Sequence, residues 1–357
     1  MKASLFDYQL DIEKIAQEPA DPRDSAKLML VDRETGKIVD RRFSDLVAIL
    51  STNDVLVFNQ TKVIPVRLLG MKSTGGKVEL LLVKQLESDT WEAISKPGLR
   101  AGQRIEVEAL RAEVIEKKEE TVILKFSDRG EFLRERIFEF GKTPIPPYIH
   151  SHKTERELRR VYQTVYAKKE GSVAAPTAGL HFSRDLLAAL QKKGVQTEFL
   201  TLHVGLGTFR GVKTERVEDH EMQAEWFSLD EGTAARLNQA RREGKKIIAV
   251  GTTTTRVLES SLAPDGTLRP GDGETNIFIY PPYKFKFVDQ VLTNFHLPKS
   301  TLVMLVAAFV SFPNTKDKFT SFKSSLMGKA YQRAIENDYR FFSFGDAMLI
   351  LWHPRRL

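Results

Sequence analysis

Four histidines stand where a turn or a predicted strand ends, or among acidic residues, and imidazole is the side chain best suited to accept protons near neutral pH. His181 follows a turn of small residues, and His203 and His296 each end a predicted strand. His220 lies in the acid-rich segment 218–225. We take His181 and His203 as the candidate catalytic residues, with His220 and His296 as further candidates. For each, a hydrogen-bonded structural role is the alternative.

Small residues surround the first two histidines. Thr177 and Gly179 precede His181 in SVAAPTAGLHF, and Gly205 and Gly207 follow His203 in LHVGLGTF. Glycine permits positive φ and lets a ligand approach backbone N–H groups closely, as at the carboxyl edges of α/β sheets. We therefore expect these four residues to bind substrate. Tight turns without a ligand are the alternative.

A run of hydroxyl side chains follows a third strand. After a predicted strand at 246–250 comes Gly251 and then Thr252, Thr253, Thr254, Thr255 and Arg256. The start of a helix offers free N–H groups and a positive dipole, and arginine can bind a carboxylate through two hydrogen bonds. The pattern indicates a pocket for an anion or carboxylate. It is not a Walker sequence, because Gly-Lys-Ser/Thr is missing, and simple N-capping is the alternative.

Alternating helices and strands must position these residues. Ser183 is a predicted N-cap and Gly194 a predicted C-terminal stop for the helix between them, and a strand follows at 195–204. Further helices are predicted at 42–50, 154–168, 233–243, 300–310 and 323–337, and further strands at 28–31, 37–41, 55–58, 276–280, 291–296 and 339–351.

A stretch of short strands interrupts this pattern. Strands predicted at 63–69, 77–86, 91–96, 103–108, 112–117 and 122–126 are typical of a small β-sandwich or barrel. A short helix at 131–140 and a proline-rich connection at 141–149 follow. We predict an α/β main domain, with a mixed or parallel sheet and flanking helices, formed by residues 1–60 and 149–357. Residues 61–148 form an inserted small β-barrel domain with a short helical exit.

Composition excludes several classes of chemistry. The 357 residues include no cysteine, so disulfides, thiolate-held zinc and iron–sulfur clusters are ruled out. Segment 218–225 has one histidine without a second, so we expect no metal. The net charge of +7 and pI near 9.3 suit a polyanionic partner. The apolar run 302–310 is too short to span a bilayer and the N-terminus lacks a signal peptide, so we expect no membrane association and a cytoplasmic location.

Many segments, in one order along nearly the whole chain, carry a resemblance to a known family. The sequence resembles the S-adenosylmethionine:tRNA ribosyltransferase-isomerases of queuosine biosynthesis. The matching segments include RDSAKLML, FNQTKVIPVRL, KPGLRAGQRIEV, SVAAPTAGLHF, LHVGLGTF, GTTTTRVLES, LTNFHLPKSTLVMLV and YRFFSFGDAMLI. The chain departs from the family pattern at Gln60, where Asp is usual, and at Gln223, where a second His is common.

The resemblance implies a reaction. The ribosyl part of S-adenosylmethionine would move to 7-aminomethyl-7-deazaguanine at the wobble position of a tRNA with a GUN anticodon, giving epoxyqueuosine, adenine and methionine. S-adenosylmethionine would be a co-substrate, without a prosthetic group or a metal, and the enzyme a bacterial α/β protein with an inserted β-barrel, monomeric or weakly oligomeric. A base would remove a proton beside the sulfonium. A tRNA-binding protein without catalysis and a His-carboxylate metal hydrolase are the alternatives.

Overall fold

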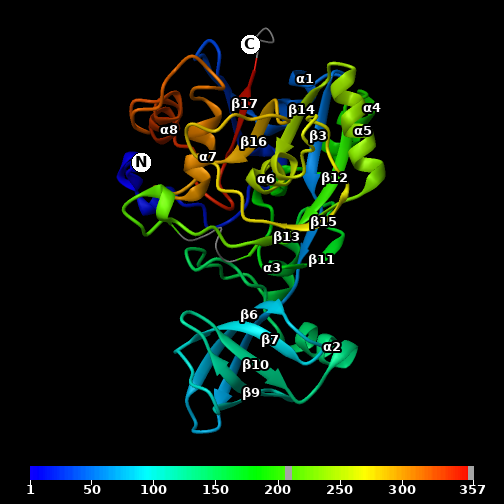
Figure 1. Ribbon diagram of the computed structural model, residues 1–357, viewed down its shortest axis with the longest axis vertical. Coiled ribbons are helices and arrows are strands. Elements are labelled where there is room, and N and C mark those ends of the chain that lie inside the picture. The colour runs from blue at the N-terminus through cyan, green and yellow to red at the C-terminus, as the bar shows by residue number, and fades with distance from the viewer. Residues whose placement is uncertain (206–210, 353–357) are drawn as a thin grey trace.

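A nine-stranded mixed sheet forms the larger lobe of the computed structural model, which describes residues 1–205 and 211–352 (Figure 1). Four neighbouring strands in the middle of the sheet are parallel to one another, the interior pair beside them is antiparallel, and antiparallel pairs also lie toward both edges. In spatial order the strands are β15 (Gly271–Thr275), β13 (Glu225–Leu229), β12 (Gln196–Leu202), β3 (Asp54–Asn59), β14 (Lys246–Val250), β16 (Gln290–Asn294), β17 (Ala347–Leu351), β1 (Lys27–Asp32) and β2 (Ile38–Arg42).

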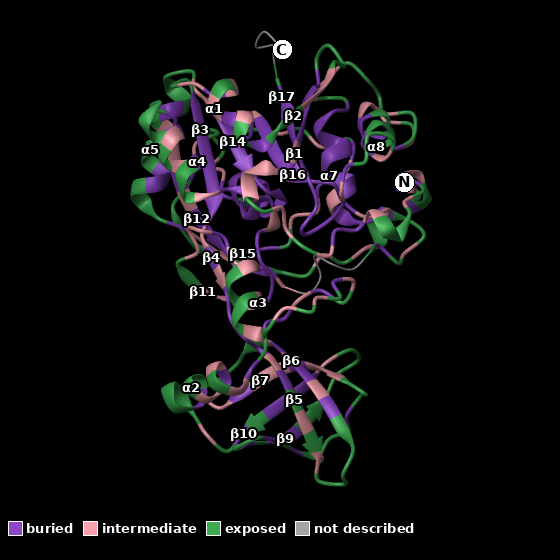
Figure 2. Ribbon diagram, turned by 180° about the vertical axis from the view of Figure 1, so that it is seen from behind, coloured by how far each residue is buried: buried purple, intermediate pink, exposed green. Residues whose placement is uncertain are grey.

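Helices cover both faces of this sheet, because its central strands are apolar on both sides. Every residue of β3, β16 and β17 is buried, and Figure 2 colours most of the strands in the larger lobe as buried. Continuous apolar runs of this kind belong to strands with both faces covered. One face packs against α1 (Leu46–Ile49) and α4 (Arg184–Lys192), the other against α5 (Glu231–Arg242), α6 (Thr252–Ser260), α7 (Thr301–Phe309) and α8 (Leu326–Glu336).

The smaller lobe is a closed barrel whose strands alternate buried and exposed residues. Leu133 and Ile137 of α2 (Gly130–Phe140) join its core. In the part of the chain that the structure describes, the barrel order is β10 (Val122–Phe126), β7 (Thr90–Lys96), β6 (Lys77–Gln85), β5 (Arg67–Lys72), β8 (Arg104–Val107) and β9 (Leu110–Lys117). The predicted fold class, an α/β lobe with an inserted β-barrel, is confirmed, whereas the exact domain boundaries stay a prediction.

A two-stranded parallel sheet lies where the chain passes between the lobes. β4 (Thr61–Val63) leads out of the large sheet, and β11 (Lys169–Ser172) leads back and pairs with it. α3 (Glu155–Val161) precedes β11 and begins at Thr154, whose hydroxyl accepts a hydrogen bond from the Glu157 amide. The outgoing and returning segments of the chain are therefore hydrogen-bonded to each other where the chain passes between the lobes.

Local signals predicted several boundaries correctly. Ser183 caps α4 by accepting a hydrogen bond from the Leu186 amide at 3.0 Å, and Gly194 has a φ of +86° after the helix ends. The hairpin of β1 and β2 is also confirmed. Within the described residues, no helix is long and apolar enough to cross a membrane.

Four predicted elements differ from the structure. The strand predicted at 339–351 begins only at Ala347. The helix predicted at 154–168 ends at Val161, because the later residues approach and enter the pairing with β4. The strand predicted at 63–69 is interrupted at Pro65, which has no amide hydrogen to donate. The strand predicted at 276–280 lies at β15 instead, and the carbonyl of Ile277 accepts from the Arg256 side chain rather than from a neighbouring strand.

Candidate active site

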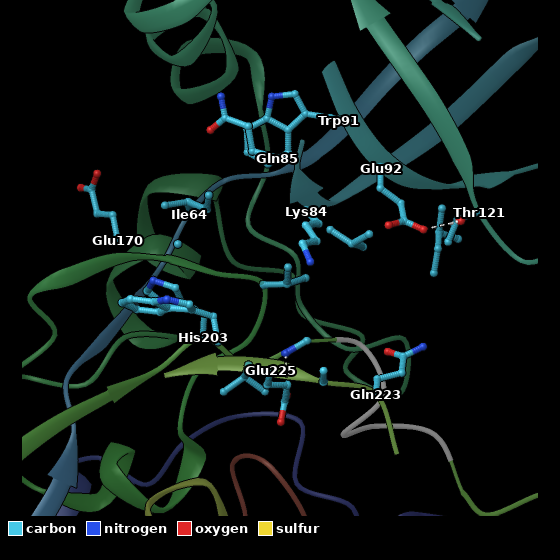
Figure 3. A pocket seen from close by; sticks show the side chains of 18 of the residues that line it. Ile64, Lys84, Gln85, Trp91, Glu92, Thr121, Glu170, His203, Gln223 and Glu225 are labelled. Carbon is cyan, nitrogen blue, oxygen red and sulfur yellow. Dashed lines mark hydrogen bonds between the residues drawn. The ribbon is translucent and has the colours of Figure 1, made fainter. Parts of the chain in front are cut away.

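A cleft of about 650 Å³ lies between the barrel and the large sheet. Figure 3 shows Trp91 and Gln85 on the barrel side, facing His203 and Glu225 on the side of the large lobe. Carboxylates outnumber basic side chains on its walls. Among the described lining residues the acids are Glu92, Glu120, Glu170, Glu225 and Glu274, and the bases other than histidine are Lys84 and Arg134.

His203, just beyond the end of β12, lies half-buried in this cleft. Its Nδ1 is 2.7 Å from the hydroxyl oxygen of Thr61, and its ring stacks on Trp226 with centroids 4.8 Å apart and planes 24° apart. Burial lowers the pKa of His203 to about 4, so the imidazole is neutral at physiological pH. When Nδ1–H donates to Thr61, the lone pair for accepting a proton lies on Nε2.

Gly171 of β11 makes this position of His203 possible. Its φ is +142°, a conformation that residues with side chains rarely adopt. A Cβ there would lie 2.5 Å from His203 Nε2 and 2.8 Å from the two adjoining ring carbons. The imidazole therefore rests directly on the glycine backbone. Sequence reasoning missed Gly171, whose only local signal is a glycine within a strand.

Arg256 lies beneath the cleft in a buried ion pair. Its guanidinium donates to Glu225 Oε2, to the Thr275 carbonyl at 3.2 Å and to the Ile277 carbonyl at 3.2 Å. The other oxygen of Glu225 accepts from the Gly205 amide at 2.8 Å. Arg256 thus holds, through Glu225, the residue two positions after His203. The sequence predicted that Arg256 would bind substrate, whereas in the structure its guanidinium donates hydrogen bonds to Glu225 and to backbone carbonyls.

A second cavity of about 40 Å³ adjoins the cleft, and Val204 lines both. Thr252 and Thr253 line it at the start of α6, where Gly251 has a φ of +92°. Thr254 and Thr255 instead donate to the carbonyls one turn earlier, at 2.8 and 3.1 Å. Only the first two threonines of the run therefore face this space. Thr177 and His296 line it as well.

His181 lies behind this small cavity. Its Nε2 accepts a hydrogen bond from the amide nitrogen of Asn294 at 3.1 Å, and the Asn294 oxygen accepts from Thr177 at 3.2 Å. Burial lowers the pKa of His181 to about 4, with a smaller opposing effect from Asp346. His181 therefore reaches the cavity through Asn294. Gly179 packs against Tyr166, where a Cβ would clash with the hydroxyl at 1.8 Å.

The other two candidate histidines differ in environment. His296 is buried between the Thr293 hydroxyl, 3.1 Å from Nε2, and the Tyr331 hydroxyl, 3.3 Å from Nδ1, and burial lowers its pKa to about 3. His220 packs edge-to-face against Phe278, and partial burial lowers its pKa. His220 is not among the residues that line either cavity.

The structure thus divides the predicted site residues into groups. The cleft is lined by His203 and Gly205, and the small cavity by Thr177, Thr252, Thr253 and His296. The remaining candidates line neither space and lie buried behind these residues: His181, Gly179, Thr254, Thr255 and Arg256. Gly207 lies outside the described residues. Sequence reasoning missed the barrel wall of the cleft altogether, because nothing in the sequence indicates which barrel residues face the large lobe.

The described residues contain no group of three or more His, Cys, Asp or Glu that could hold a metal ion. Gln223, one of the two departures from the expected family pattern, lines the cleft. Gln60 lies outside it, with its amide 3.5 Å from the Thr201 hydroxyl. Of the two departures, only Gln223 is therefore in position to meet a ligand in the cleft.

Known proteins match this chain over nearly its whole length, including both lobes. The model of the queuosine biosynthesis protein family matches residues 3–350. An S-adenosylmethionine:tRNA ribosyltransferase-isomerase of Clostridium kluyveri is 47% identical over 356 residues, covering 98% of this chain and 100% of that protein. One of Thermotoga petrophila is 48% identical over 355 residues, with the same coverage.

A solved structure is similar as well. The crystal structure of S-adenosylmethionine tRNA ribosyltransferase from Thermotoga maritima shares 36% identity and a TM-score of 0.55, covering 98% of this chain and 100% of that one. Because the family model and the curated relatives span nearly the full length, the chain belongs to the queuosine biosynthesis protein family and is a transferase of that family.

Proposed function

We propose that the chain transfers and isomerises the ribosyl part of S-adenosylmethionine onto 7-aminomethyl-7-deazaguanine at the wobble position of a tRNA with a GUN anticodon. The products are epoxyqueuosine-tRNA, adenine and methionine. The observation that carries the proposal is the cleft between the lobes, lined by a neutral histidine and several carboxylates, in a chain nearly half identical to named ribosyltransferase-isomerases.

The charge of the cleft supports this pair of substrates. S-adenosylmethionine carries a sulfonium, and the aminomethyl group of the base is an ammonium at neutral pH. Three of the five lining glutamates already have close cationic partners: Glu225 pairs with Arg256, Glu274 with Lys84, and Glu170 with Lys62 and Arg134. The attraction for such cations therefore comes chiefly from Glu92 and Glu120, whose lysine partners are 3.9 and 4.0 Å away, because opposite charges attract strongly where water is partly excluded. The tRNA backbone itself is polyanionic, which suits the net charge of +7 on the whole chain.

His203 is the proposed base for the first step. The sulfonium acidifies the adjoining 5′ carbon of the ribose, and a neutral Nε2 can accept the proton that leaves it. Its ring is held by Thr61, Trp226 and the backbone of Gly171, so its position is set before substrate binds. Proton transfers to the departing adenine and from the attacking amine would follow in the same cleft.

The small cavity is the proposed site for the methionine carboxylate of S-adenosylmethionine. Thr252 and Thr253 line it beside the free amides at the start of α6, and a helix N-terminus favours an anion. A space of about 40 Å³ admits a carboxylate but not a nucleoside. His181 acts here as a positioning residue, through Asn294 and Thr177.

We also propose a cytoplasmic enzyme, monomeric or weakly oligomeric, that needs neither a metal nor a prosthetic group. One experiment tests the function: purified protein is incubated with S-adenosylmethionine and tRNA carrying the 7-aminomethyl-7-deazaguanine base, and adenine and methionine are measured. Matched reactions use tRNA with unmodified guanine, and protein treated with a strong chelator. Release of both products only with the modified base, unaffected by the chelator, is expected.

Other results would point elsewhere. Tight binding of the modified tRNA without adenine release would indicate a non-catalytic tRNA-binding protein, for which Gln223 in the cleft is the motivating observation. Loss of activity on chelation would contradict the absence of a metal. Adenine release with unmodified tRNA at the same rate would contradict the proposed acceptor.

A further inference from the structure

Trp226 is an exposed tryptophan inside the cleft. It is 37% exposed and belongs to the small set of large apolar side chains that the described surface leaves open. An indole in a concave site, surrounded by polar groups, indicates a surface kept for a ligand rather than for the core. The reaction scheme proposed above uses this side chain only to hold the His203 ring and assigns it no contact with a substrate.

The backbone holds Trp226 rigidly. β13 pairs with β12 on one side and β15 on the other, and the Trp226 carbonyl accepts a hydrogen bond from the His203 amide at 2.9 Å. Trp226 lies opposite Glu274 in the register with β15, and Glu274 pairs with Lys84 of the barrel at 3.3 Å. The indole therefore sits at the point where the two lobes meet.

Aromatic stacking already begins at this position. The indole and the His203 imidazole are nearly parallel, with centroids 4.8 Å apart, and the imidazole in turn rests on Gly171. One flat ring is therefore supported by another, and the indole keeps exposed surface in the cleft. Flat π systems stack favourably in this way, and every nucleobase offers such a face.

We propose that Trp226 is the stacking platform for a bicyclic nucleobase, either the adenine of S-adenosylmethionine or the 7-deazaguanine of the tRNA. The inference rests on the proposed function and adds a specific contact to it. His203 occupies one face of the indole, so the nucleobase stacks on the other face. The ribose that is attached to adenine, or that becomes attached to the deazaguanine, then reaches His203 around the edge of the indole. Gln223, Gln85 and Glu274 line the same cleft and offer polar groups to the edges of the base.

The test measures binding without turnover. Trp226→Ala and Trp226→Phe are compared with wild type, and Trp352→Ala removes a similarly exposed indole that follows directly after β17 and does not line the cleft. The first arm measures S-adenosylmethionine affinity by calorimetry. The second arm measures fluorescence anisotropy of a labelled anticodon stem-loop carrying 7-aminomethyl-7-deazaguanine, and of the same stem-loop with an abasic wobble position.

Trp226→Ala is expected to weaken one ligand on the order of 5- to 150-fold, the range of one base–aromatic stack. Trp226→Phe should retain most of the affinity, and Trp352→Ala all of it. Weaker S-adenosylmethionine binding alone assigns adenine to the platform. Weaker binding of the modified stem-loop, with the abasic stem-loop unchanged, assigns the deazaguanine.

Two results would overturn the platform. Unchanged affinity for both ligands in Trp226→Ala would do so, as would an equal loss for the modified and abasic stem-loops together with a lower melting temperature, since that pattern reports disruption of β13. The proposed function is judged separately. Wild-type protein that binds both ligands but releases no adenine counts against that function and leaves the platform intact.

Discussion

The buried pair of Arg256 and Glu225 offers a sharp test of what Arg256 does. Both side chains are 4–5% exposed, and the arginine also satisfies the carbonyls of Thr275 and Ile277. Arg256→Met removes the cation and leaves the carboxylate buried without it. Breaking a buried pair from one side costs about 3–5 kcal/mol. We therefore expect a loss of unfolding free energy of that size.

The double variant Arg256→Met with Glu225→Leu measures the pair itself. It removes both charges, so it should be more stable than the sum of the two single losses predicts, with a coupling energy of about 0.5–3 kcal/mol. It will not recover fully, because the Gly205 amide then loses its acceptor. Arg104→Met, which breaks an exposed pair with Glu113 on the barrel, is the control and should cost less than about 1 kcal/mol.

The assay is urea unfolding followed by circular dichroism, combined with calorimetric binding of S-adenosylmethionine to the folded variants. If Arg256 is structural, stability falls steeply, and affinity falls through displacement of Gly205. The reasoning would be refuted if Arg256→Met kept wild-type stability and lost only S-adenosylmethionine affinity. That result would mean that the guanidinium binds the substrate carboxylate.

Three further predictions concern the histidines. His203→Ala should reduce adenine release by at least about 100-fold at unchanged S-adenosylmethionine affinity, as loss of a general base does. His181→Ala should chiefly weaken S-adenosylmethionine affinity. If kcat and KM show the opposite pattern, the two histidines exchange roles. Gly171→Ala should lower kcat like His203→Ala because its methyl group meets the imidazole at 2.5 Å, and normal kcat would contradict this contact. Finally, burial lowers the pKa values of His181 and His296 from 6.5 to about 4 and about 3, so as the pH falls these histidines take up protons in the unfolded chain before they do so in the folded one. Their contribution to the unfolding free energy is therefore fully present above about pH 6.5 and should fall by about 2 kcal/mol per histidine at about pH 5. Urea unfolding midpoints that do not change with pH would contradict this prediction.

Local patterns were enough for much of the fold. The Ser183 cap and the Gly194 stop bound α4 because capping depends on atoms within one helical turn. The short alternating strands after residue 61 indicated a barrel, since alternation reports a strand with one buried face. The alternating pattern predicted a strand wrongly at residues 276–280, where the side chain of Arg256, distant in sequence, donates a hydrogen bond to the Ile277 carbonyl.

The sequence also determined the family and the kinds of residue at the site. Histidines, glycines and threonines next to strand ends predicted a ligand site at one edge of the sheet, because the spacing of strands and turns is a local property. Only the tertiary structure decided that Arg256 meets Glu225, that His181 reaches the small cavity through Asn294, and that Trp226 supports His203. These contacts join residues that strand order and lobe packing bring together, and no periodicity along the chain records that order.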